Sequence, residues 1–198
     1  MQRLTTIAQG ISRVGAIAGG ALLLIASIVI CIDITTRYLF SWTVGGADEL
    51  SGYALAIASA WGFSTAILSR SHIRIDTLYV RVRRPARAML DLMSLAALAF
   101  FFALVTWHAW GVVRQSWVSQ SRSQSELETL LVIPQGLWFA GLAFFVAVAL
   151  LLLVQALLAV FGRDLDALFA TIGSKSAVAE AEEEVAAVEK AFAEERKS

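Results

Sequence analysis

The sequence predicts an all-α integral membrane protein with four transmembrane helices. Its 198 residues are 58% hydrophobic and only 16% charged, with a mean hydropathy of +0.71. Soluble domains are nearer half apolar and a quarter charged. The apolar excess is concentrated in four long runs, and lysine and arginine are distributed unevenly between the segments that join them. These observations together place the chain in a membrane.

Charged residues delimit the four runs, which hold 19, 20, 22 and 34 uncharged residues. One crossing needs about 20 residues, so the last run is too long for one straight span and too short for two. Pro134 suits the first turn of a helix and places the start of the fourth span near it. The expected spans are about 14–34, 50–69, 89–113 and 134–161, within one membrane domain of residues 1–162.

The basic residues predict the orientation of the chain. Thirteen lie in the N-terminal segment, the second connection and the tail, and three lie on the other side: Arg37, Arg114 and Arg122. Cytoplasmic segments carry the excess of lysine and arginine, so both termini and the second connection are expected in the cytoplasm. We interpret the first run as a retained helix, because no small-residue cleavage site with a polar region follows it.

The connection from His72 to Arg87 and the tail of residues 163–198 are the charged cytoplasmic parts. In the connection, four apolar residues share one helical side with arginines around them: Ile75, Leu78, Tyr79 and Val82. This pattern predicts a short interfacial helix on anionic lipid. The alternative, a positive loop that only fixes topology, explains the arginines but not the apolar stripe. The acidic, alanine-rich tail is compatible with an isolated helix or with disorder, and carries no recognisable chemistry.

Charge also gathers where the first and second spans meet on the outer side. Asp33 and Arg37 are four residues apart and can pair on a continuing helix. Gly45 and Gly46 mark a turn, and Asp48 and Glu49 then begin the second helix. Carboxylates are stabilising there, because the N-terminal end of the helix dipole is positive. Capping and anchoring explain these residues; the alternative is that Arg37 and the acidic pair clamp the first hairpin or grip a partner.

Small residues form a smooth face on the second span. Ala54, Ala58 and Gly62 recur at four-residue spacing, and Gly15 and Gly19 do so in the first span. Such faces allow close helix packing in lipid, against a helix of this chain or of another protein. The connection from Ser116 to Glu128, rich in serine and glutamine, is expected to be an exposed loop.

Residue types that carry chemistry are sparse. His72 and His108 are expected far apart across the membrane, so a shared haem is not expected. No P-loop, GxSxG, HExxH or CxxC pattern occurs, so we predict no catalytic, metal or cofactor site in this chain. Zero net charge gives no argument for nucleic acid. The span centres carry no charge, whereas transport paths usually need polar groups or broken helices there. These features are typical of an accessory or scaffold subunit.

Four motifs in order carry a family resemblance: RY at Arg37–Tyr38, the acidic pair Asp48–Glu49, RSHIRIDTL at Arg70–Leu78 and IPQGLW at Ile133–Trp138. With four spans and this length, the chain resembles the small, DctQ-like membrane subunit of tripartite ATP-independent periplasmic (TRAP) transporters, over roughly residues 10–162. The family often has tryptophan before a Glu-Glu pair, whereas Gly46 and Ala47 precede the acids here. The acidic tail also lies outside the family pattern.

The resemblance implies a non-enzymatic scaffold in the bacterial inner membrane. The partners would be a large membrane subunit, which carries the sodium and substrate sites, and a periplasmic protein that delivers an organic acid. Arg37, Asp48 and Glu49 would hold the periplasmic side, and His72, Arg74 and Asp76 the cytoplasmic side. A stand-alone carrier or membrane enzyme is the alternative, and recruitment of cytoplasmic proteins through the tail is a third.

Overall fold

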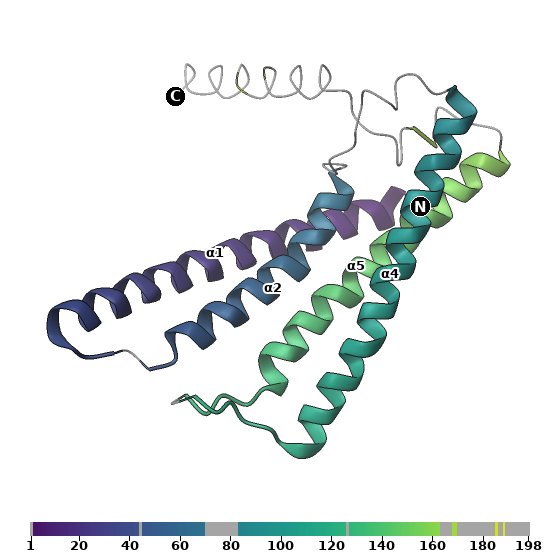
Figure 1. The fold of residues 1–198 in the computed structure, drawn as a ribbon. Coiled ribbons are helices and arrows are strands. Elements are labelled where there is room, and N and C mark those ends of the chain that lie inside the picture. The colour runs from purple at the N-terminus through teal and green to yellow at the C-terminus, as the bar shows by residue number, and fades with distance from the viewer. Residues whose placement is uncertain are drawn as a thin grey trace.

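The chain forms four long helices in the computed structural model, which describes residues 2–43, 45–69, 83–125 and 127–162, with residues 168, 169, 185 and 188. The helices are α1 (Gln2–Phe40), α2 (Ala47–Leu68), α4 (Arg84–Ser119) and α5 (Val132–Phe161) (Figure 1). Each is long and apolar enough to cross a membrane. The all-α fold with four membrane-spanning helices is therefore confirmed. The predicted interfacial helix and most of the tail lie outside the described residues.

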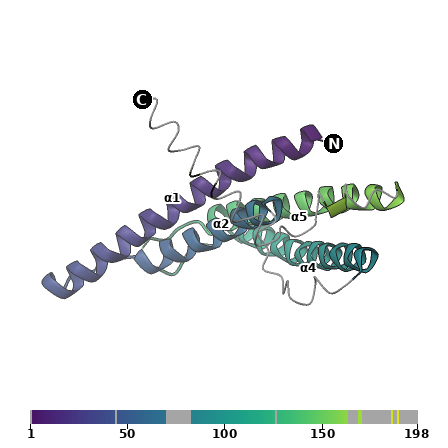
Figure 2. The same cartoon turned by 90° about the horizontal axis from the view of Figure 1, so that it is seen from above.

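The helices are arranged as a row and not as a closed bundle. The main contacts join α1 to α2, α2 to α5, and α5 to α4. α1 and α2 form one antiparallel hairpin and α4 and α5 form another (Figures 1 and 2). The helices of the two hairpins diverge toward their loops, and the α4–α5 loop extends back to the start of α2. α2 and α5 lie at the centre of the row, so α1 and α4 each have one main helical neighbour and broad faces without one.

The helices exceed the uncharged runs at several ends. α1 has 39 residues and α4 has 36. At 1.5 Å per residue these measure roughly 58 and 54 Å, about twice the thickness of a bilayer's hydrocarbon core. Both therefore tilt or extend beyond it. α4 continues to Ser119, and Ser116 is buried in it. The expected loop start at Ser116 was thus wrong, because the chain turns only after the left-handed Gln120.

The core lies where the two hairpins meet. Phe102 of α4 packs edge-on against Phe145 of α5 with ring centroids 4.5 Å apart, and Phe63 of α2 lies 5.2 Å from Phe102. Phe145 is almost fully buried. Beyond α5, Leu168 is fully buried in the same cluster. Aromatic rings from three helices therefore join the row at its middle.

Local sequence signals explain the helix boundaries. Gly46 has φ 86°, a left-handed conformation that glycine adopts without steric cost, and it precedes α2 as its N-cap. Pro85 lies at the start of α4, and Pro134 in the first turn of α5, where a missing N–H costs nothing. The predicted turn at Gly45–Gly46 and the predicted start of the fourth helix near Pro134 are confirmed.

Candidate functional site

The turn between α1 and α2 and the loop between α4 and α5 meet at one end of the molecule, which we call the loop end. On α1, Arg37 pairs with Asp33 at 2.5 Å, as the spacing predicted. The Thr43 hydroxyl donates to the other carboxylate oxygen of Asp33 at 2.8 Å. Asp33 is buried whereas Arg37 is exposed. This network fastens the turn to the last two turns of α1.

Glu49 connects the two hairpins. Its carboxylate accepts hydrogen bonds from the hydroxyl of Tyr53, one turn along α2, and from the hydroxyl of Ser125 in the α4–α5 loop. Beside it the Leu127 side chain lies against Gly46, so closely that a Cβ on the glycine would meet a leucine carbon at 2.3 Å. A polar link and an apolar contact thus join the loops, and we call residues 46, 49, 125 and 127 the strap.

The structure separates the residues that the sequence grouped at this end. Arg37 bonds to Asp33 and Thr43 of its own hairpin, whereas Glu49 bonds across to the other hairpin. Asp48 is exposed, and α2 has no side-chain cap. His72, Arg74 and Asp76, the predicted cytoplasmic set, lie outside the described residues.

The small-residue face of α2 is used in part by this chain. Ala54 is buried, and Ala58 lies against Gly19 of α1, where an added Cβ would stand 2.9 Å from the Ala58 Cα. At Gly62 an added Cβ would meet nothing within 4 Å. The Gly15–Gly19 face of α1 therefore packs on α2, and Gly62 keeps open space beside it.

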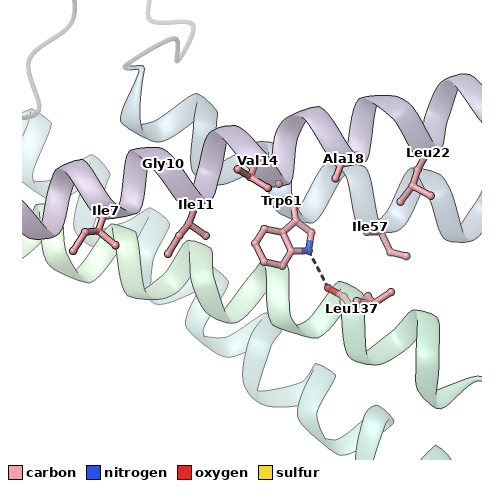
Figure 3. A pocket seen from close by; sticks show the side chains of 11 residues that line it. Ile7, Gly10, Ile11, Val14, Ala18, Leu22, Ile57, Trp61 and Leu137 are labelled. Carbon is pink, nitrogen blue, oxygen red and sulfur yellow. Dashed lines mark hydrogen bonds between the residues drawn. The ribbon is translucent and has the colours of Figure 1, made fainter.

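Trp61 is the contact residue that sequence reasoning missed. Its ring lies between Gly15 of α1 and Gly141 of α5, and its indole N–H donates to the Leu137 carbonyl at 3.2 Å (Figure 3). The ring also stacks on Phe144. Tryptophans of membrane proteins are enriched at the membrane–water interfaces, and the N–H of a buried tryptophan usually donates a hydrogen bond. A tryptophan in the middle of an apolar span was the signal that pointed to such a junction.

Polar contacts between helices lie toward the N-terminal end of α1. The hydroxyls of Ser12 and Thr65 are 2.6 Å apart, and the Gln155 amide of α5 donates to the Thr5 hydroxyl at 3.1 Å. The buried hydroxyl of Ser64 has no hydrogen-bond partner in the described part of the chain. His108 is exposed, with Nδ1 2.9 Å from the Leu104 carbonyl.

Among the described residues, no group of three or more His, Cys, Asp or Glu could hold a metal ion. Asp33 and Asp91 are buried carboxylates of the described part of the chain, and they lie near helix ends, on α1 and α4. The chemistry available at the loop end is therefore hydrogen bonding and ion pairing, which positions loops.

Comparison with known proteins gives one match. Residues 26–163 match the family model of the tripartite ATP-independent periplasmic transporters, DctQ component, and this range includes α2, α4, α5 and the C-terminal part of α1. No curated protein and no solved structure matches the chain. The chain belongs to the DctQ family, and is a small membrane subunit of a TRAP transporter.

Proposed function

We propose that this protein is a non-catalytic scaffold that braces the large membrane subunit of a sodium-driven TRAP transporter. The transporter would import an organic acid, delivered as a carboxylate by a periplasmic binding protein. The chain would lie in the bacterial inner membrane with both termini in the cytoplasm. Systems of this family contain such a large subunit and binding protein. Sodium and substrate would bind to the large subunit.

The row of helices is the observation that carries the proposal. A carrier surrounds its substrate path, and the path lies between helices that present polar groups near the bilayer midplane. Here α1 contacts mainly α2, and α4 contacts mainly α5, so the four described helices form an open row and not a closed bundle. Its broad faces are apolar and exposed, with Ile17 and Leu24 of α1 and Phe100 and Trp107 of α4 among them. Such a slab suits a second membrane protein.

The strap supports a bracing role on the periplasmic side. Glu49 and the Gly46–Leu127 contact fix the two loops relative to each other. Loops that are already held in place lose less conformational entropy when a binding protein docks, so the affinity of that surface is higher. We propose that Arg37, Asp48 and Glu49 hold this surface, and that His72, Arg74 and Asp76 hold the cytoplasmic side.

Affinity purification of the chain from its native membrane in mild detergent, followed by mass spectrometry, tests the proposal. A large multi-span membrane protein should copurify in stoichiometric amount. Purification of a stable, monodisperse chain without such a partner would contradict the scaffold role. The alternative of a carrier or enzyme would then be tested by saturable flux or bound cofactor in liposomes that contain this chain alone.

A further inference from the structure

A groove of about 650 Å³ runs along α1 and is lined by apolar side chains and glycines (Figure 3). α1 supplies eight residues between Ile7 and Leu22, α2 supplies Ile57 and Trp61, and α5 supplies Leu137. Along α1 the lined stretch measures roughly 22 Å, longer than one leaflet of the hydrocarbon core. The space is thus extended along the helix and has the length of a lipid chain.

Small residues on α1 create the groove, and they serve two purposes. Gly15 and Gly19 allow α1 to lie close to Trp61 and Ala58 of α2, so α1 and α2 leave no gap along that side of the groove. Gly10 has nothing within 4 Å of an added Cβ, so its missing side chain leaves space that no part of the described chain fills. An unfilled apolar space loses the dispersion contacts of its lining, so within a bilayer hydrocarbon enters it.

Hydrogen bonds tie α1 to its neighbours near the N-terminal part of the groove. The Thr5–Gln155 hydrogen bond ties α1 to α5 beside Ile7, and the Ser12–Thr65 bond ties α1 to α2. A transmembrane helix is 10–12 Å across with its side chains. Because α1 approaches α5 to hydrogen-bond distance at Thr5 and Gln155, the groove suits a single hydrocarbon chain better than a helix of a partner subunit.

A positive charge lies beyond the N-terminal end of the groove. Arg3 is exposed and lies four residues before Ile7, and therefore on the same side of α1 as the groove. An arginine at the end of an apolar channel matches a lipid phosphate, which it binds through charge-assisted hydrogen bonds. We propose that this groove binds one acyl chain of an anionic phospholipid, with the lipid phosphate at Arg3.

The proposal goes beyond the scaffold function, and the full chain alone tests it. The protein is placed in nanodiscs of phosphatidylcholine with a trace of phosphatidylglycerol that carries a diazirine in its acyl chain. After irradiation, labelled peptides are identified by mass spectrometry. The label should fall on residues 7–22 of α1 and on Trp61. Label confined to other faces of the helices would overturn the proposal.

Two glycine variants form a matched pair. Gly10→Leu fills the groove, whereas Gly20→Leu makes the same change where an added Cβ also meets nothing but outside the groove lining. Gly10→Leu should reduce labelling at Trp61, because the leucine side chain occupies space that the acyl chain would otherwise fill. Gly20→Leu should leave labelling unchanged. Equal labelling of Gly10→Leu and wild type would contradict occupancy by a lipid chain.

The phosphate contact has its own test. Arg3→Gln should abolish the preference for phosphatidylglycerol over phosphatidylcholine when both carry the diazirine, while the position of the label stays the same. A preference that survives this change would refute the assignment of the phosphate to Arg3. In the native complex, cross-linking of the groove to a large-subunit helix in place of lipid would also refute the proposal.

Discussion

Glu49 links the two hairpins at the loop end, and its neighbour Asp48 is exposed. Replacement of Glu49 by arginine removes the acceptor for Ser125 and Tyr53 and reverses the charge. In the assembled transporter we expect Glu49→Arg to reduce uptake without a change in substrate preference, because we propose that the substrate binds to the large subunit. Uptake of radiolabelled substrate into cells, at equal protein level, measures this.

Asp48→Arg is the control for that experiment, since it makes the same charge change one residue away without removing a bond of the strap. It should reduce uptake less than Glu49→Arg does. If uptake with Glu49→Arg is normal, the strap has no part in transport. If both variants lose activity equally, local negative charge matters and the bond to Ser125 does not.

Replacement of two buried serines by alanine should have different effects on the stability of the chain. Ser12 bonds to Thr65 across α1 and α2, whereas the Ser64 hydroxyl is buried without a partner. Ser12→Ala should destabilise the chain by about 0.6 kcal/mol and by no more than about 1.7, the range for interhelical hydrogen bonds in membranes. Ser64→Ala should be neutral or stabilising, because it removes an unsatisfied buried hydroxyl.

Unfolding in mixed micelles of mild detergent and dodecyl sulfate measures both serine variants. A loss of stability in Ser64→Ala that equals the loss in Ser12→Ala would show that the Ser64 hydroxyl has a partner, such as a bound water.

At the scale of elements, the α1–α2 hairpin depends on the close approach of the helices at Gly19. A Cβ there would stand 2.9 Å from the Ala58 Cα, and a backbone atom cannot move aside as a flexible side chain does. Gly19→Leu should therefore cost about 1–3 kcal/mol. Gly20→Leu, with open space at the same depth, should change stability by less than about 0.5 kcal/mol.

The same unfolding assay compares the two variants, and a disulfide or spin-label distance between α1 and α2 reports whether the hairpin separates. Similar stability of Gly19→Leu and Gly20→Leu would mean that α1 can shift along α2 at little cost. The Gly15–Gly19 face of α1 would then contribute little to stability, and the polar contacts between α1 and α2 would hold the hairpin together.

At the scale of the whole molecule, the row of helices predicts dependence on a partner. Liposomes that contain this chain alone should show no saturable carboxylate flux, because the described helices form an open row and not a closed bundle. Addition of the large subunit and the binding protein should give sodium-dependent uptake. Saturable flux through the chain alone would support the carrier alternative.

Truncation after Gly173 tests whether the acidic tail has a role in this assembly. The family match ends at residue 163, so the fold that it describes does not include the tail. Uptake by the truncated protein should equal that of the full chain. A fall in uptake at unchanged protein level would support recruitment of a cytoplasmic protein through the tail.

The sequence determined the four helices, because a bilayer requires about 20 uncharged residues per crossing and charged residues delimit each run. It also predicted the ion pair of Asp33 and Arg37, the turn at Gly45–Gly46 and the start of α5 near Pro134, since these are local interactions within a few residues. The resemblance to the family was also recognised from the sequence, because it depends on short motifs and on their order and spacing along the chain.

The arrangement of the helices became known from the three-dimensional structure. A face of small residues such as Ala54, Ala58 and Gly62 predicts close packing but does not name the neighbour, which here is α1 at Ala58 and open space at Gly62. The bond from Glu49 to Ser125 joins residues 76 positions apart. Trp61 acquired its role from glycines on two other helices. Long-range contacts depend on how the two hairpins pair. Hydropathy specifies each span separately and does not specify this pairing.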